Sequence, residues 1–205
     1  MFDFLFIDMD DTVLDFKKAE YTAIRKTLAE AGLDPTDEVC SRYSQINDGY
    51  WKRLERKEVT RRQLQVGRFA DLFAELGITA DGEKCADRYM ENLAQGHDFM
   101  PGAEGALQSL SKKYKLYLAS NGNTDTQKSR IASAGIEKYF EAIFISGEIG
   151  VNKPDKLFFD RCGRACITAV IFGIIVNCFI VEGLYPCGIK LFCNYFPYHH
   201  HIIFF

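Results

Sequence analysis

A short apolar segment that ends in paired aspartates constrains this chain more than any other feature. Residues 4–7 have the length and apolar character of a strand buried in a sheet. Asp8 and Asp10 follow at its carboxyl end, which is where open α/β sheets bind their ligands. Side chains two residues apart on an extended chain point the same way, so these carboxylates repel unless a cation or a shared proton relieves them. The first hypothesis is therefore a functional site at this strand end.

The next stretch, residues 16–96, shows helical periodicity and no strand pattern. Four helices are expected, recognised by capping residues at their starts or glycines at their ends. They are 17–31 stopping at Gly32, a helix from Thr36 towards Arg56, one from the capping box Thr60–Gln63 to Gly77, and one from Thr79 to near Gly96.

From Pro101 onward strands and helices alternate. The expected elements are a helix at 102–112, a strand at 115–119, a helix at 124–134, a strand at 141–145 and a helix at 155–164. Such alternation implies right-handed crossovers and a mainly parallel sheet. The predicted fold class is therefore α/β, with a Rossmann-like core made of 1–15 and 97–205. The inserted segment 16–96 is predicted to form an α-helical cap over the carboxyl edge of the sheet.

The last part of the chain has a different composition. Residues 165–205 contain no Asp, and their only Glu and Lys are Glu182 and Lys190. A buried strand followed by irregular structure is the favoured interpretation. A membrane span over 165–181 is an alternative, although the run is at the short end of the ~20 residues that a spanning helix needs. A third is a segment foreign to the domain, such as a reading-frame shift would produce, which would leave the core incomplete at its C-terminus.

Composition and charge narrow the class of protein. The chain has 205 residues, of which 47% are hydrophobic and 26% charged, as in soluble globular proteins. A net charge of -3, without a basic stripe interleaved with aromatic residues, argues against a nucleic-acid partner. The N-terminus lacks the pattern of a secretory signal, so the expected location is the cytoplasm.

The paired aspartates suit phosphoryl transfer. Asp8, exposed at a strand end, is a candidate nucleophile that would form an aspartyl-phosphate. Asp10 is a candidate general acid that protonates the leaving oxygen and later activates water. Thr12 sits in the turn that follows, where its hydroxyl would help to shape a phosphate-binding loop. The predicted substrate is therefore a small phosphomonoester.

Two later segments supply positive charge and hydrogen-bond donors. Ser120, Asn121 and Gly122 follow the expected strand at 115–119, so the Ser120 hydroxyl and the next backbone N–H groups are candidates for holding phosphoryl oxygens. Lys153-Pro154-Asp155 follows the strand at 141–145, with Pro154 expected in the first turn of a helix. Lys153 is expected to neutralise Asp8 and the phosphate. The aspartate pair, the Ser120 turn and the Lys153 loop are each weak indications alone. Chance hardly explains their occurrence at the ends of three successive strands.

These residues resemble the motifs of the haloacid dehalogenase-like hydrolases. Asp8-x-Asp10-x-Thr12 is similar to the first motif of that family, Ser120 to the second and Lys153-Pro154 to the third. The resemblance implies phosphatase activity, because an Asp at position 10 marks the phosphatases. The segment 16–96 looks like the C1-type cap of the family. Further segments resemble bacterial pyrimidine 5′-nucleotidases that act on noncanonical nucleotides: 8–16, 45–51, 96–102 and 120–124. The resemblance covers roughly 1–163.

The resemblance also implies Mg²⁺, with Asp8 and Asp10 as ligands, Asp10 through its backbone carbonyl. The fourth motif of the family, a Gly-Asp that supplies another carboxylate for the metal, is missing. Residues 170–173 look like the strand that approaches it, but Ile174 stands where Asp is expected and no Asp follows Asp160. Glu182 is the sole acid in the tail. Weak Mg²⁺ binding is therefore expected.

The leading hypothesis is a Mg²⁺-dependent phosphatase of nucleoside 5′-monophosphates, with substrate selected by the cap. The alternatives are a catalytically impaired or noncatalytic member of the family and a membrane-tethered phosphatase. Within the cap, Tyr50 and Trp51 are candidates for stacking on a base. Packing of Trp51 in the cap core is the favoured interpretation.

Overall fold

The structure is a computed structural model that describes residues 4–166 and 203–204. Its contacts divide the chain into two compact units, of which one runs from Phe16 to Gly96 and the other takes the residues on either side. The expected strand at 170–173 and position 174 lie outside the described residues, as does most of the apolar run 165–181. Within the described part of the chain, no helix is long and apolar enough to cross a membrane.

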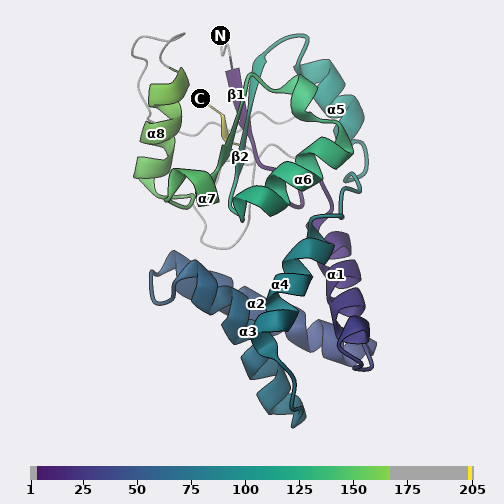
Figure 1. The fold of residues 1–205 in the computed structure, drawn as a ribbon. Helices are drawn as coiled ribbons and strands as arrows, with labels where there is room; N and C mark the ends of the chain where they lie inside the picture. The colour runs from purple at the N-terminus through teal and green to yellow at the C-terminus, as the bar shows by residue number, and fades with distance from the viewer. Residues whose placement is uncertain (1–3, 167–202, 205) are drawn as a thin grey trace. The chain divides into compact units, whose positions relative to one another are not determined.

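A sheet in the order β3-β2-β1-β4 forms the centre of the first unit (Figure 1). The strands β1 (Phe4–Ile7), β2 (Lys115–Ser120) and β3 (Ala142–Ile145) are parallel, and the short β4 (Ile203–Phe204) runs antiparallel to β1. Ile7 is paired with Leu118, so β1 and β2 end at the same edge. The predicted mainly parallel, Rossmann-like α/β core is confirmed.

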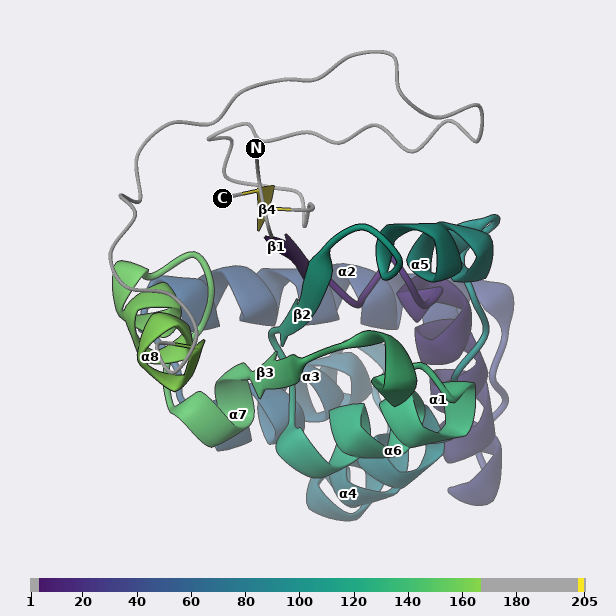
Figure 2. The same ribbon diagram turned by 90° about the horizontal axis from the view of Figure 1, so that it is seen from above.

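Helices cover both faces of the sheet because the strands are apolar on both sides. Leu5, Ile7 and Leu118 face one cluster, which also contains Leu107 of α5 (Ala103–Leu110) and Ile131 of α6 (Thr124–Ala134). Alternate strand residues face a second cluster, which includes Phe158 and Cys162 of α8 (Lys156–Cys166). Figure 2 shows α6 and α8 on opposite sides of the strands.

The connections after β2 and β3 differ from the prediction in two ways: they contain two short helices that the sequence did not predict, and Pro154 lies elsewhere than expected. The additional elements are the short helices η1 (Glu137–Tyr139) and α7 (Ser146–Ile149). Pro154 was expected in the first turn of a helix, and this prediction was wrong. It lies in a turn after a cis Lys153–Pro154 peptide bond. The side chain of Asp155 instead accepts a hydrogen bond from the Leu157 N–H at 3.0 Å, and α8 begins at Lys156.

The second unit consists of four helices, α1 (Phe16–Glu30), α2 (Asp37–Glu55), α3 (Arg61–Leu76) and α4 (Gly82–Leu93). Thr36 caps α2 and Thr60 opens α3 with a capping box, as the sequence predicts. The expected cap of α4 was wrong. Asp81 takes the position proposed for Thr79, because its carboxylate accepts the Lys84 N–H at 3.0 Å.

An aromatic core holds these four helices together. The rings of Tyr43, Phe69 and Tyr89 are fully buried, with centroids 5.1–5.8 Å apart. Aromatic pairs at such distances add to the free energy gained from burial. Trp51 is partly buried and packs against this core, which agrees with the interpretation favoured from the sequence.

A chain of buried polar groups crosses the same core. The Arg68 guanidinium donates to the Asn47 side-chain oxygen at 2.7 Å, and the Asn47 amide donates to Glu20 at 2.6 Å. Glu20 also accepts a hydrogen bond from the Ser44 hydroxyl. Burial raises the pKa of Glu20 above its usual 4.5, against the opposing effect of the bonds from Ser44 and Asn47 and the charge of Arg68. The ionised form of Glu20 is therefore less favoured in the folded unit than in the unfolded chain.

This shift predicts how the stability of the helical unit depends on pH. A carboxyl whose pKa is raised on folding stabilises the fold fully at low pH, and that stabilisation is lost as pH rises through the folded pKa. Glu20→Gln removes the titration, so its free energy of unfolding relative to wild type should increase as pH rises from about 4 towards neutrality. Urea unfolding followed by the fluorescence of Trp51, the single tryptophan, measures this difference in the helical unit.

Glu75→Gln is the matched control. A hydrogen bond from Arg42 lowers the pKa of Glu75, so this variant should show the opposite trend with pH. A Glu20→Gln difference that stays flat or falls with pH would contradict the expected burial effect.

Candidate active site

A tight loop after β1 fixes the two aspartates of the first motif. The Met9 carbonyl oxygen accepts the N–H groups of Val13 and Leu14, both at 2.9 Å. Asp11 adopts a left-handed conformation (φ 54°), which Asp tolerates better than most residues. The side chains of Met9, Val13 and Leu14 are buried in the core, so the loop is anchored on both sides of Asp10.

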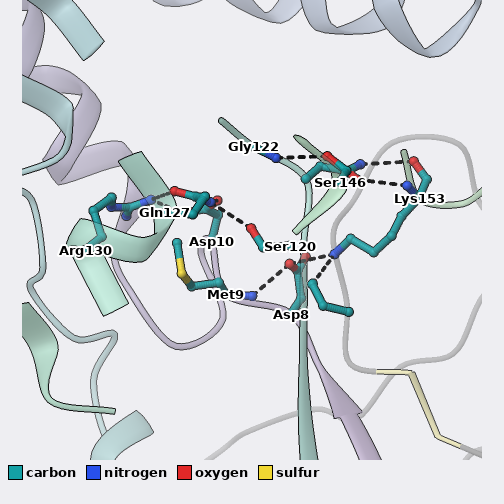
Figure 3. Close-up of polar contacts among 11 residues, drawn as sticks. Asp8, Met9, Asp10, Ser120, Gly122, Gln127, Arg130, Ser146 and Lys153 are labelled. Atoms are coloured by element: carbon teal, nitrogen blue, oxygen red, sulfur yellow. Dashed lines mark hydrogen bonds and ion pairs between the residues drawn. The ribbon is translucent and has the colours of Figure 1, made fainter. Parts of the chain in front are cut away.

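Asp8 forms a buried ion pair with Lys153. The Lys153 Nζ lies 2.7 Å from the Asp8 Oδ1 and donates a second hydrogen bond to the Ala119 carbonyl oxygen at 2.6 Å (Figure 3). The Asp8 Oδ1 also accepts the Met9 N–H at 2.8 Å. Asp8 is only 4% exposed and Lys153 only 8%, so the expectation that Asp8 is exposed at the strand end was wrong. The ammonium therefore neutralises a carboxylate that burial would otherwise make costly.

Asn121 positions the loop that carries Lys153. Its side-chain amide donates to the Lys153 carbonyl oxygen at 3.0 Å and accepts the Lys153 N–H at 2.8 Å. This reciprocal pair joins the end of β2 to the segment after β3 across 32 residues of sequence. The Asn121 side-chain amide thus binds backbone in the structure, and the group suggested by the sequence for holding phosphate is the Asn121 backbone N–H.

Asp10 has partners from a different element. The Arg130 Nη1 lies 2.5 Å from the Asp10 Oδ1, and the Gln127 Nε2 donates to the Asp10 Oδ2 at 2.8 Å. Both partners belong to α6. Burial raises the pKa of Asp10 above its ordinary value. The Arg130 charge acts in the opposite direction, and the neighbouring Asp8 raises the pKa further.

The remaining residues of the site lie at the carboxyl end of β2 or beside it. Ser120 is fully buried, and its Oγ accepts a hydrogen bond from the Gln127 Nε2 at 2.7 Å. The Gly122 N–H donates to the Ser146 Oγ at 3.1 Å. Thr12 is half-buried in the turn after β1, where its N–H reaches the Met9 carbonyl oxygen at 3.4 Å. The backbone N–H of Gly122 is thus bonded to protein in the structure.

The structure brings the groups expected from the sequence to one edge of the sheet. Several of these groups, however, are bonded to three residues that the sequence reasoning missed: Gln127, Arg130 and Ser146. Gln127 and Arg130 are three residues apart on a helix that directly follows the Ser120 loop, a spacing that places them on one helix face. Ser146 directly follows β3. The spacing of Gln127 and Arg130 and the position of Ser146 at a strand end were the sequence signals that could have identified these residues.

The described residues supply two groups that suit a divalent cation. The Asp8 carboxylate and the Asp10 backbone carbonyl offer the hard oxygen ligands that Mg²⁺ prefers. The Asp10 carboxylate is directed to Arg130 and Gln127 instead. Within the described part of the chain, no cluster of three or more His, Cys, Asp or Glu side chains is arranged to hold a metal.

Comparison with known proteins agrees with this arrangement. A family model described as a haloacid dehalogenase-like hydrolase matches residues 2–169. The chain belongs to this family. It is 38% identical over 162 residues to the pyrimidine 5′-nucleotidase PynA of Streptococcus pneumoniae, a match that covers 78% of this chain and 68% of PynA. It is 28% identical over 158 residues to the pyrimidine 5′-nucleotidase YjjG of Escherichia coli, covering 77% and 68%.

A solved structure shows the same fold. It is the putative hydrolase YfnB of Bacillus subtilis, whose crystal structure with bound magnesium has a TM-score of 0.76 and 32% sequence identity to this chain. The match covers 80% of this chain and 72% of YfnB. The chain spans about two thirds of the length of the curated relatives that it matches. The family and the nucleotidase relatives support a phosphatase.

Proposed function

We propose that this protein is a Mg²⁺-dependent phosphomonoester hydrolase that acts on nucleoside 5′-monophosphates, with pyrimidine nucleotides preferred. The observation that carries the proposal is the arrangement of two aspartates with separate cations, Asp8 with Lys153 at 2.7 Å and Asp10 with Arg130 at 2.5 Å. This gives the two carboxylates different environments, which is what a nucleophile and a general acid in one site require. The names of PynA and YjjG support the choice of substrate.

The proposed reaction has two displacements. The Asp8 carboxylate attacks phosphorus, the bond from phosphorus to the ester oxygen breaks, and Asp10 donates a proton to the leaving alcohol. Water then attacks the phosphorus of the aspartyl-phosphate while Asp10 takes up its proton, which releases phosphate and restores Asp8. Lys153 offsets the negative charge of Asp8 and of the incoming phosphoryl group.

Mg²⁺ would be held by the Asp8 carboxylate and the Asp10 backbone carbonyl, and it would supply further positive charge beside the phosphoryl oxygens. The helical unit 16–96 is proposed as the cap that selects the substrate. Asn121 and Ser120 are proposed to position Lys153 and the Asp10 partners, whereas the Thr12 hydroxyl is the proposed contact to phosphate.

A substrate panel tests the proposed function. The full chain with Mg²⁺ should release phosphate from pyrimidine nucleoside 5′-monophosphates faster than from purine ones, and EDTA should abolish the release. The preference for pyrimidine over purine nucleotides is measured as the ratio of their kcat/KM values. A pocket that hydrogen-bonds the correct base binds the transition state of the other nucleotide less tightly.

A chain that releases no phosphate from any nucleotide or aryl phosphate would favour the noncatalytic alternative. Ile174 at the position of the fourth-motif Asp is the sequence observation that keeps this alternative open. In that case equilibrium binding of a nucleotide without turnover is the remaining activity to measure.

A further inference from the structure

Both oxygens of the Asp10 carboxylate are bound by side chains from the same helix face. Arg130 contacts one oxygen and Gln127 the other, and the Arg130 Nη1 also donates to the Gln127 Oε1 at 3.1 Å. The three groups therefore form a closed triangle of hydrogen bonds (Figure 3). A carboxylate held at both oxygens has a fixed plane as well as a fixed position.

Arg130 is unusual for a helical arginine because its side chain is completely buried. Arginine is almost never fully buried unless it is paired, since its charge loses the solvation of water. The ion pair with Asp10, 120 residues away in sequence, supplies that compensation. Packing alone would favour an apolar residue here, so the buried charge indicates a role tied to Asp10.

Gln127 links Asp10 to the second motif. It is only 3% exposed, and its Nε2 donates both to Asp10 and to the Ser120 Oγ at 2.7 Å. The orientation of the amide is determined by its partners, because only the NH₂ group can donate to a carboxylate and only the oxygen can accept from Arg130. A Cβ at Gly122 would lie 2.6 Å from the Gln127 Cγ, so the glycine leaves room for this side chain.

We propose that Arg130 and Gln127 are positioning residues that hold the Asp10 carboxylate in the orientation required for proton transfer to the leaving oxygen. The proposal rests on the proposed function, in which Asp10 is the general acid. Both side chains contact Asp10 and each other, and Gln127 also contacts Ser120, so they are proposed to act through Asp10. Arg130 and Gln127 should therefore affect the rate only when the leaving group has to be protonated by Asp10.

The leaving group separates this role from a purely structural one. A nucleoside leaves as a strongly basic alkoxide unless it is protonated, whereas p-nitrophenolate leaves readily without a proton. General acid catalysis contributes roughly 10²–10⁴-fold when it is needed. Loss of the Asp10 orientation should therefore slow hydrolysis of a nucleotide far more than hydrolysis of p-nitrophenyl phosphate.

The experiment compares the two substrates in Arg130→Met and Gln127→Met of the full chain with Mg²⁺, as single-turnover rate constants. We expect a loss of about 10²-fold on the preferred nucleotide and at most about 10-fold on p-nitrophenyl phosphate. The ratio of the two rates does not depend on how much of a preparation is folded, so partial misfolding cannot produce the result. Arg130→Lys, which keeps the charge, should recover part of the ratio.

Two comparisons complete the test. Asp10→Asn should show the same selective loss, and Arg130→Met should add little to it, because residues that act as a unit are not additive. Lys128→Met is the matched control on the same helix. Lys128 pairs with Glu148 at 3.3 Å and is 57% exposed, so its ratio should equal that of wild type.

Equal losses on both substrates in Arg130→Met and Gln127→Met, with a selective loss in Asp10→Asn, would overturn this inference while leaving the proposed function in place. An Asp10→Asn variant without selectivity would remove both the general-acid role and the inference. A wild-type chain that hydrolyses neither substrate would overturn the proposed function itself, and the inference with it.

Discussion

Asp8→Asn should abolish turnover while the protein remains folded. The amide is nearly isosteric with the carboxylate and can still accept the Lys153 hydrogen bond, which is 2.7 Å long in the structure. It cannot act as the nucleophile, and removal of a catalytic nucleophile costs roughly 10⁶-fold in rate. Phosphate release from a nucleotide and from p-nitrophenyl phosphate should both fall to the level of the buffer, because the first displacement is lost whatever the leaving group.

A covalent readout makes this prediction specific. Acid-quenched wild-type protein should carry hydroxylamine-labile phosphate during turnover, and Asp8→Asn should carry none. Asp11→Asn is the matched control, because Asp11 is an exposed residue of the same loop and Asn tolerates its left-handed conformation. It should retain wild-type activity within a few-fold. Substantial hydrolysis by Asp8→Asn would rule out the aspartyl-phosphate mechanism.

The local signals in the sequence predicted the helix ends well where one residue was the clear candidate. Thr60 and Gln63 form the expected capping box, and the helix that they open ends at Gly77 in a left-handed conformation. Thr79 and Asp81 compete two residues apart before α4, and both are good capping residues. Capping propensity therefore does not decide between them, and the structure shows that Asp81 caps α4.

The grouping of the site was predictable because parallel strands end at a common edge. Asp8 and Lys153 are 145 residues apart, yet each follows a strand of the same sheet. The roles of individual groups were less predictable. The backbone N–H groups of Asn121 and Gly122 were proposed as donors to phosphate. In the structure the Gly122 N–H donates to Ser146, and the Asn121 side chain, for which the sequence predicted no separate role, bonds to Lys153. A turn sequence shows which polar groups are present, but it does not indicate which neighbouring group each of them will hydrogen-bond.

Arg130 was missed for a different physical reason. Charged residues on an amphipathic helix normally face water, so an arginine at that position gives no sign of burial. Its partner Asp10 comes from a loop 120 residues earlier, and no periodicity within the helix reveals the pair. A buried ion pair is specified by the tertiary fold, which periodicity does not encode.

Lys153→Met should destabilise the sheet unit because it leaves the Asp8 carboxylate buried without its cation. The two side chains are 9% and 3% exposed, so water replaces little of the lost interaction. Breaking one partner of a buried ion pair typically costs about 3–5 kcal/mol. We expect a fall of that order in the free energy of unfolding at neutral pH, measured by urea unfolding with EDTA present so that no metal substitutes for the ammonium.

The Asp8→Asn background separates the charge from the packing of the lysine stem. With a neutral amide at position 8, the same Lys153→Met change should cost less by about 2 kcal/mol or more, since no uncompensated charge remains. The cost that persists measures the lost packing and the hydrogen bond to the Ala119 carbonyl oxygen, 2.6 Å from the Lys153 Nζ. If Lys153→Met costs the same in both backgrounds, the ammonium does not stabilise the Asp8 carboxylate. The charge-neutralising role proposed for Lys153 in catalysis would then lose its physical basis.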